Sequence, residues 1–321
     1  MDVVVAGSHG LVGSALVADL VERGHGVRRL VRRGAESDDG SAAGEAAPGE
    51  AAPDEADAVR QVLWDPRTGE LDPAALEGAD AVVNLAGAGI GDHRWTPAYK
   101  QKLLGSRTTT TSLLARTIAR LDGPPVLVNA SAVGAYGDRG DELLTEASER
   151  GDDFLAHLVK AWENATAPAA EAGARVVWLR SGIVLAPSGG ALGRMLPLLR
   201  LGVGGPLGSG RQWWSWITLA DEVAAIRHVI DANVRGPVNA VAPEPTTNRE
   251  LTRALARALS RPAGLAVPRF ALRIALGQLA DDLIASQRAV PAVLNRTGFT
   301  WTHADPEAAA RWVAGRPAAG A

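Results

Sequence analysis

The chain has 321 residues, of which 46% are hydrophobic and 21% are charged, and these proportions are ordinary for a globular protein. Its formal net charge of -3 gives no reason to expect nucleic acid or an acidic membrane surface as a partner. The sequence contains no cysteine, which excludes disulfides, thiolate catalysis and cysteine-ligated metal sites.

Short apolar runs alternate with helical patterns along the first half of the chain. These runs are apolar on both faces, which is typical of a parallel sheet that helices cover on both sides. The expected strands are Val3–Ala6, Val27–Val31, Val62–Trp64, Ala81–Ala86, Val126–Ala130 and Arg175–Arg180. The expected helices are Leu11–Arg23, Pro97–Leu121, Phe154–Ala172, Leu219–Ala232 and Arg249–Leu259, with more within Val267–Ala321.

Residues 34–57 interrupt this alternation between the second and third expected strands. The segment carries acidic residues but no Lys or Arg, and it is rich in Ala, Gly and Pro without apolar periodicity. Such a composition does not bury enough surface to order itself, so we expect a disordered, solvated insertion. The rest of the chain is then mildly basic, which suits an anionic ligand but also an ordinary surface.

The first expected strand runs into the sequence GSHGLVG, which contains Gly7, Gly10 and Gly13 and opens a helix. In this context the glycines allow a tight turn, close approach of a pyrophosphate and close packing of helix on strand. The N–H groups at the helix start then bind the anion. We therefore predict a dinucleotide site formed by Gly7, Ser8, His9, Gly10, Leu11, Val12 and Gly13.

Arg32 and Arg33 follow the second expected strand, where an NAD site usually carries an acidic residue, ~20 residues past the glycines. Guanidinium groups suit the 2′-phosphate of NADP. These residues favour NADP(H) as the cofactor, although two arginines also commonly end a surface strand.

Several further segments resemble the short-chain dehydrogenase/reductase superfamily, in its extended, sugar-nucleotide-epimerase-like branch. They are Asn84–Gly87, Asp65, Ser131–Gly137 (SAVGAYG), Leu179–Leu185 and Trp216–Val223 (WITLADEV). Longer strings, among them NLAGAGIGDHRWTPAYKQKLLGSR and LGQLADDLIASQRAVPAVLNRTGF, resemble one uncharacterised "epimerase family protein" subfamily with a C-terminal domain of unknown function. The resemblance implies a Rossmann-type doubly wound parallel sheet with a smaller, mostly helical C-terminal lobe. It also implies cofactor contacts from Asp65, Leu85, Ala86, Gly87, Arg180, Gly182 and Val184, and Arg107 is a further candidate for the phosphates.

The superfamily usually uses a Tyr, a Lys four residues later and a Ser or Thr, and in the extended branch a Glu often follows the Lys by four. Counting back from Glu163 gives Val159 and Leu155, which are both apolar. This register predicts that the usual Tyr-x-x-x-Lys pair is absent. Tyr136 and Ser131 are the remaining candidates for proton transfer, although the ring of Tyr136 could equally pack under the helix.

A second set of residues is expected to contact a small-molecule substrate. The segment Arg200–Ile217 combines glycines with three tryptophans, which suits a flexible lid, although at least one tryptophan is expected in the core. The candidate substrate-binding residues are Arg94, Trp95, Arg211, Gln212, Trp213 and Trp216. The cleft is expected to fit a partly aromatic or apolar, possibly anionic, compound.

These expectations divide the chain into an NADP-binding domain, residues 1–185 and 217–242, and a substrate lobe, residues 186–216 and 243–321. The leading hypothesis is an NADP(H)-dependent oxidoreductase with an atypical active site. The alternatives are a non-catalytic NADPH-binding sensor or scaffold and a nucleotide-sugar epimerase. No apolar run reaches the ~18 residues of a membrane span and the first residues lack the basic region of a signal peptide, so we expect a cytoplasmic monomer or homodimer.

Overall fold

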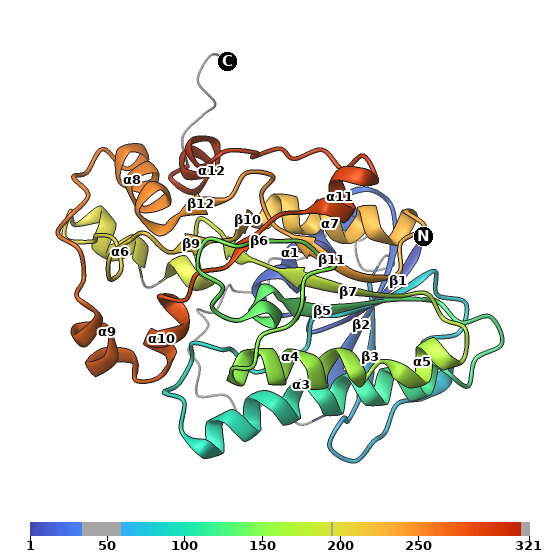
Figure 1. The fold of residues 1–321 in the computed structure, drawn as a ribbon. Helices are drawn as coiled ribbons and strands as arrows, with labels where there is room; N and C mark the ends of the chain where they lie inside the picture. The colour runs from blue at the N-terminus through green and yellow to red at the C-terminus, as the bar shows by residue number, and fades with distance from the viewer. Residues whose placement is uncertain (34–58, 194, 316–321) are drawn as a thin grey trace.

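A seven-stranded parallel sheet forms the centre of the structure, a computed structural model that describes residues 1–33, 59–193 and 195–315 (Figure 1). The strand order is β11-β7-β5-β4-β1-β2-β3, and every neighbouring pair is parallel. The strands are β1 Asp2–Ala6, β2 Gly26–Arg32, β3 Val59–Trp64, β4 Ala81–Asn84, β5 Val126–Ala132, β7 Val176–Ser181 and β11 Gly236–Ala240. This confirms the predicted Rossmann-type α/β fold. The predicted disordered insertion, residues 34–57, lies outside the described residues.

Helices cover both faces of the sheet (Figure 1). One face carries α1 (Leu11–Glu22), α7 (Leu219–Asp231) and α11 (Ala292–Arg296), and the other carries α3 (Pro97–Ile118), α4 (Phe154–Asn164) and α5 (Ala167–Glu171). The strand order reverses between β1 and β4. In such sheets, ligands bind beyond the carboxyl ends of the strands at this reversal, which here is the end of β1.

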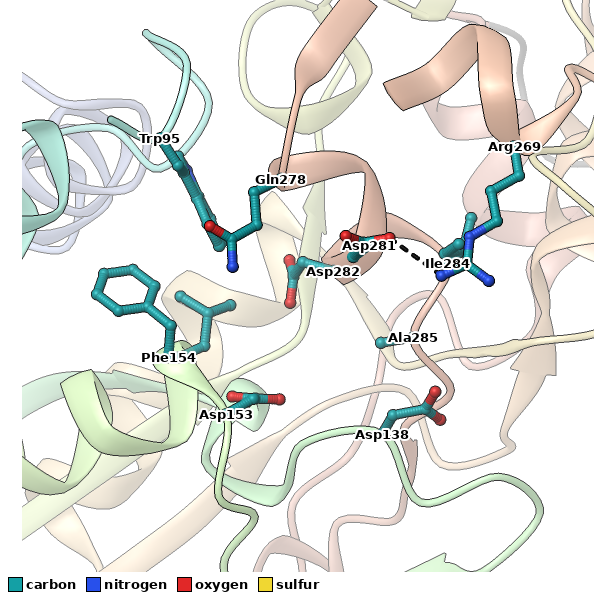
Figure 2. A pocket seen from close by; sticks show the side chains of 11 residues that line it. Trp95, Asp138, Asp153, Phe154, Arg269, Gln278, Asp281, Asp282, Ile284 and Ala285 are labelled. Atoms are coloured by element: carbon teal, nitrogen blue, oxygen red, sulfur yellow. Dashed lines mark hydrogen bonds and ion pairs between the residues drawn. The ribbon is translucent and has the colours of Figure 1, made fainter. Parts of the chain in front are cut away.

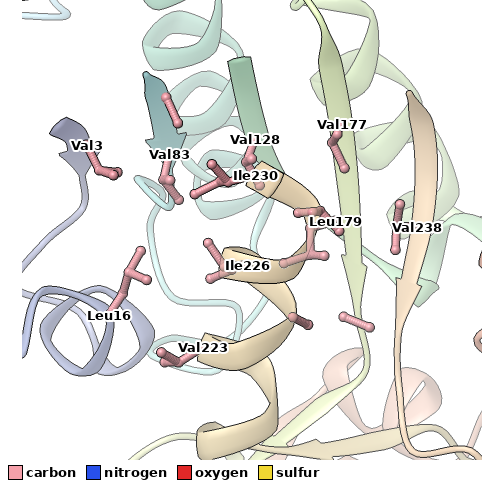
Figure 3. Close-up of a cluster of buried hydrophobic side chains, with 14 of the residues drawn as sticks. Val3, Leu16, Val83, Val128, Val177, Leu179, Val223, Ile226, Ile230 and Val238 are labelled. Carbon is pink, nitrogen blue, oxygen red and sulfur yellow. The ribbon is translucent and has the colours of Figure 1, made fainter. Parts of the chain in front are cut away.

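The main hydrophobic core lies between the sheet and the helices α1 and α7 (Figure 3). Val3, Val83 and Leu179 from the sheet and Leu16 and Ile226 from the helices are all fully buried there. Each such side chain contributes roughly 1.5–3 kcal/mol by leaving water. This packing fixes the carboxyl ends of the strands, and therefore the loops that follow them.

Two expected elements differ from the structure. The expected helix Phe154–Ala172 is two helices, because Pro168 has no N–H and its ring would collide with the carbonyl group four residues earlier. The third strand begins at Val59 rather than Val62 and lies at the edge of the sheet, where Arg60 and Gln61 are exposed. It is therefore not apolar on both faces.

A second hydrophobic cluster lies at one end of the sheet, on the left in Figure 1. Its helices are α6 (Met195–Arg200), α8 (Asn248–Ala258), α9 (Arg269–Leu276), α10 (Leu279–Leu283) and α12 (Pro306–Val313). Short strands form three separate two-stranded sheets, which pair β10 with β8, β12 with β9 and β13 with β6. These strands are β6 Leu143–Leu144, β8 Ile183–Leu185, β9 Trp213–Trp214, β10 Trp216–Thr218, β12 Thr246–Thr247 and β13 Arg288–Ala289. Single 3-10 turns occur at Pro73–Ala75 (η1), Val133–Tyr136 (η2) and Ala191–Gly193 (η3).

The packing crosses the domain boundary that the sequence suggests. Val293, Leu294 and Phe299 belong to the C-terminal segment but pack into the main core under the sheet. The division into two domains therefore stays a prediction. Within the described residues, none of the helices combines the length and apolar character that crossing a membrane requires.

Candidate cofactor and substrate site

The three glycines of the turn after β1 differ in the space around them. At two of them neighbouring backbone atoms leave no room for a Cβ atom, and the third, which we call open, has room. Gly7 has a φ of +81°, and a Cβ atom there would lie 2.6 Å from the carbonyl carbon of Leu85. A Cβ atom at Gly13 would lie 2.2 Å from the Gly7 carbonyl oxygen. At Gly10 the nearest atom would be 3.4 Å away. Gly7 and Gly13 are thus required by packing, whereas Gly10 leaves its outer side open for a ligand.

Gly10 is also the residue that caps the start of α1, and no side chain accepts a hydrogen bond from the first N–H groups of this helix. No acidic side chain lies in its first turn. The neighbouring Ser8 is buried and accepts a hydrogen bond from Arg29 Nε at 3.2 Å, so it holds the turn in place. His9 is exposed, and partial burial and the nearby Arg29 lower its pKa. A free helix N-terminus of this kind suits an anion.

The end of β2 carries two exposed arginines. Arg33 lies 3.3 Å from Glu70 in an ion pair whose side chains are both 61% exposed, so this pair contributes little to stability. Arg32 forms no ion pair with the described part of the chain. Asp65, beyond β3, accepts a hydrogen bond from the Arg67 backbone at 2.8 Å, which together with the Arg67 charge lowers its pKa. Among the described residues, Arg32 is thus a cation without an ion-pair partner at the end of β2.

The segment after β4 brings Leu85, Ala86 and Gly87 next to Arg107 of α3. A Cβ atom at Gly87 would lie 3.2 Å from the guanidinium carbon of Arg107, a tight contact, so Gly87 and this side chain lie directly against each other. Arg107 is 8% exposed, donates a hydrogen bond to the Leu103 carbonyl at 3.1 Å and has no partner for its Nε. Burial lowers its pKa to about 10, so it stays charged at neutral pH. A buried cation with an unused donor therefore lies at the carboxyl edge of the sheet.

Helix α4 turns Leu155, Val159 and Glu163 inward, as their spacing of four residues requires. Val159 and Glu163 are fully buried, whereas Leu155 is partly exposed and contacts Gly134 of η2. Lys160 points outward, and His157 lies on the surface, 3.1 Å from Asp152. Asp153 caps the helix by accepting the Ala156 N–H at 2.8 Å.

A cavity of about 270 Å³ opens at this end of α4 (Figure 2). It lies between the start of α4, the loop after η2, the segment before α3 and the helices α9 and α10. Leu155, the residue at the register position of the superfamily tyrosine, is part of its wall. The lining residues are Trp95, Asp138, Asp153, Phe154, Leu155, Arg269, Gln278, Asp281, Asp282, Ile284 and Ala285.

A family model described as NAD dependent epimerase/dehydratase family matches residues 3–242. The chain belongs to this family. A second model, a domain of unknown function (DUF1731), matches residues 267–313, which include α9 to α12. These matches confirm the resemblance that the sequence motifs indicate, including the C-terminal domain.

Three similar proteins match nearly the whole length of this chain. Epimerase family protein Mb2239 from Mycobacterium bovis is 45% identical over 303 residues, covering 94% of this chain and 93% of that protein. A crystal structure of human epimerase family protein SDR39U1 (isoform2) with NADPH has a TM-score of 0.83 at 33% identity, covering 98% of this chain and 99% of the human chain. A nucleoside-diphosphate sugar epimerase from Corynebacterium glutamicum has a TM-score of 0.73 at 36% identity, covering 100% of this chain and 59% of that chain.

The two residues predicted to transfer a proton in this family member are sealed inside the protein. The Tyr136 hydroxyl, 0% exposed, donates to Asn239 Oδ1 at 2.7 Å and accepts from Arg180 at 3.0 Å. Burial raises its pKa. Ser131 donates to Glu163 at 2.6 Å. Both hydroxyls are thus engaged by buried side chains, and their role in proton transfer stays a prediction.

Arg180, which is predicted to contact the cofactor, also forms its hydrogen bonds with buried residues of the protein. Its guanidinium donates two hydrogen bonds to Glu163, at 2.9 and 3.1 Å, and it is 3% exposed. Gly182 has no space for a side chain, because a Cβ atom there would lie 2.5 Å from the Ser215 carbonyl oxygen. Val184, in β8, stays partly exposed. Of these three residues, only Val184 keeps a side chain that a ligand can contact.

The tryptophan-rich segment does not form the predicted lid. Gln212 is buried and donates to the Leu207 carbonyl at 3.0 Å, Trp216 is 1% exposed, and Trp213 donates to Asp141 at 2.7 Å. Arg211 is exposed. None of the four residues lines the cavity. The segment instead packs as core and as support for the C-terminal lobe.

Of the predicted substrate residues, only Trp95 lines the cavity. Its indole N–H donates to the Ile90 carbonyl at 2.9 Å, which fixes the ring against the wall. Arg94 points to α9 instead and donates to the backbone carbonyls of Ile274 and Ala275. The aspartates of the cavity were not predicted, because they come from three segments that only the fold brings together.

Proposed function

We propose that the chain is an NADP(H)-dependent oxidoreductase of the extended short-chain type that transfers a hydride to or from a small molecule. The observation that carries this proposal is the open Gly10 at the start of α1, with Arg32 at the end of β2, which forms no ion pair with the residues that the structure describes. The NADPH in the crystal structure of human SDR39U1 supports the same choice of cofactor.

The residues around the turn fit a dinucleotide. The N–H groups at the start of α1 would hold the pyrophosphate, and Arg32 would hold the 2′-phosphate. The unused Nε of Arg107 offers a further donor near Gly87. When bound, NADPH supplies the hydride.

We infer that the proton does not come from the phenol that the superfamily usually uses. Leu155 and Val159 stand at the register positions of the superfamily's Tyr and Lys, and neither carries a titratable group. Leu155 instead presents an apolar surface to the cavity. The chain therefore orients the substrate without supplying the usual phenol, and we infer that water or the substrate itself provides the proton.

Cofactor choice is tested by titrating the protein with NADPH and NADH while following tryptophan fluorescence. We expect NADPH to bind more tightly, and Arg32→Ala to weaken NADPH about 10–100-fold with little effect on NADH. Arg60→Ala is the matched control, because Arg60 is exposed on the neighbouring strand, away from the turn. Tighter binding of NADH would sink the assignment of Arg32.

Hydride transfer is tested by following NADPH absorbance with a panel of aldehydes, ketones, quinones and activated alkenes. We expect turnover that persists in Tyr136→Phe, because that hydroxyl is sealed. Strong loss of turnover in a folded Tyr136→Phe variant would contradict this placement. NADPH binding without turnover across the panel would favour the sensor over the oxidoreductase.

A further inference from the structure

The cavity beside Leu155 contains more negative charge than the surrounding protein balances. Of its four aspartates, Asp281 is paired with Arg269 and Arg273 at 3.1 and 2.8 Å. Asp138, Asp153 and Asp282 form no ion pair with the described part of the chain. Asp138 accepts backbone N–H groups from Gly140 and Ser286, and Asp153 accepts one from Ala156. These backbone bonds position two of the carboxylates but do not neutralise them.

Asp282 of α10 differs from the other carboxylates because its side chain accepts no hydrogen bond from the residues that the structure describes. Figure 2 shows its carboxylate pointing toward Asp153 and the side of the cavity formed by α4. Burial and the charge of Asp153 raise its pKa to about 7. Two carboxyl groups that face one cavity repel each other when both are ionised, and a cation between them would remove that repulsion.

Aromatic rings form another part of the wall. Trp95 and Phe154 meet edge to face, with ring centroids 5.3 Å apart. The Lys100 ammonium lies 4.5 Å from the centroid of Phe154, so this ring already attracts one cation. Aromatic faces and carboxylates together are the usual surroundings of a bound ammonium group.

We propose that this cavity binds the ammonium-type cationic group of a small substrate, with Asp282 as its counter-ion and Trp95 and Phe154 as its aromatic walls. The inference rests on the proposed function, because it names the substrate class of the same site. A nucleoside diphosphate fits poorly, since its charge would face three unbalanced carboxylates. The volume of about 270 Å³ lies just below the range of typical ligand pockets, which starts at about 300 Å³, so the ligand must be small.

The cation that fits is organic rather than metallic. No group of three His, Asp or Glu side chains within the described ranges is arranged to hold a metal ion. The aromatic walls supply no metal ligand but do attract a quaternary ammonium. Arg269 also lines the cavity, but Asp281 engages it.

The test uses choline and its neutral carbon isostere, in which a tert-butyl group replaces the trimethylammonium group. Both are titrated into the protein while the Trp95 indole N–H is followed by NMR. We expect choline to bind in the millimolar range, about tenfold more tightly than the isostere. Asp282→Asn should remove this preference. Asp152→Asn is the matched control, because Asp152 is exposed next to Asp153 but outside the cavity lining.

The pH dependence of choline binding gives an independent readout. Choline keeps its charge at every pH, so its affinity should rise as Asp282 ionises through a pKa of about 7. The other charged groups that line the cavity are Asp138, Asp153, Asp281 and Arg269, and the Lys100 ammonium lies against Phe154 in its wall. The rise should be absent in Asp282→Asn.

Three results would overturn the proposal: equal affinity for choline and the isostere, unchanged choline binding in a folded Asp282→Asn variant, or no choline binding up to its solubility limit. NADPH titration separates these failures from failure of the proposed function. NADPH binding without choline binding overturns the cation site alone. Choline binding without NADPH binding overturns the oxidoreductase and leaves the cation site in place.

Discussion

Two carboxyl groups near opposite ends of α4, Glu163 of α4 itself and Asp282 of α10, are in opposite situations. Burial alone would raise the pKa of Glu163, but hydrogen bonds from Arg180, Ser131 and Arg150 outweigh it and leave the pKa low. At the other end, Asp282 faces Asp153 and has a pKa raised to about 7. The comparison teaches that a carboxylate with a full set of partners belongs to the scaffold. A carboxylate that lacks such partners is available to bind a ligand.

The largest change in the free energy of unfolding is expected for a substitution of Glu163. Glu163→Ala leaves Arg180 buried without its counter-ion, which should lower the free energy of unfolding by about 4 kcal/mol. Urea denaturation followed by circular dichroism measures it. Glu171→Ala, an exposed position on α5, should change stability by less than about 0.5 kcal/mol. A loss below about 1 kcal/mol in Glu163→Ala would show that the network is not structural.

Substitutions at Val159 and Leu155 should differ in their effect on stability, because Val159 is packed in the core and Leu155 lines the cavity. Val159→Lys places an ammonium in a position that is 1% exposed, and we expect it to lower the free energy of unfolding by about 3 kcal/mol. Leu155→Tyr should change it by less than about 1.5 kcal/mol, because the side chain can extend into the cavity. The same denaturation series compares both variants. Equal losses would mean that Leu155 is packed as tightly as Val159.

The smallest change is expected for a substitution of Asp282, and it should raise the free energy of unfolding instead of lowering it. Its raised pKa means that the folded protein keeps a proton that the unfolded chain has released, so its ionisation lowers stability as pH rises from about 4 to about 7. Asp282→Asn removes this loss. The variant should therefore be more stable than the parent by about 1–2 kcal/mol at about pH 8, and equal to it below about pH 4. A variant less stable than the parent at about pH 8 would contradict the unpaired carboxylate.

Local patterns predicted the parts of this molecule that depend on neighbours in the sequence. The spacing of Gly7, Gly10 and Gly13 predicted a tight turn that leads into a helix, and the structure has this turn. Counting back from Glu163 predicted the inward face of α4 correctly, because helix geometry alone fixes it. The break before α5 was missed, although Pro168 was its local signal.

The sequence did not show which polar groups stay accessible. Tyr136 and Gln212 are chemically suited to a site, yet the structure seals the first against Asn239 and the second against the Leu207 carbonyl. Neither partner is recognisable from a sequence pattern, because each contact depends on how separate elements pack.

The sequence by itself determined the parallel sheet, the cofactor turn with Arg32 beside it, and an α4 without titratable groups at Leu155 and Val159. These follow from periodicity and spacing, which act over a few residues. Only the tertiary structure decided that Asp153 and Asp282 face one cavity, because the C-terminal lobe folds back onto the start of α4. Charge balance in a cavity is a property of that packing, since it depends on which distant side chains exclude water together.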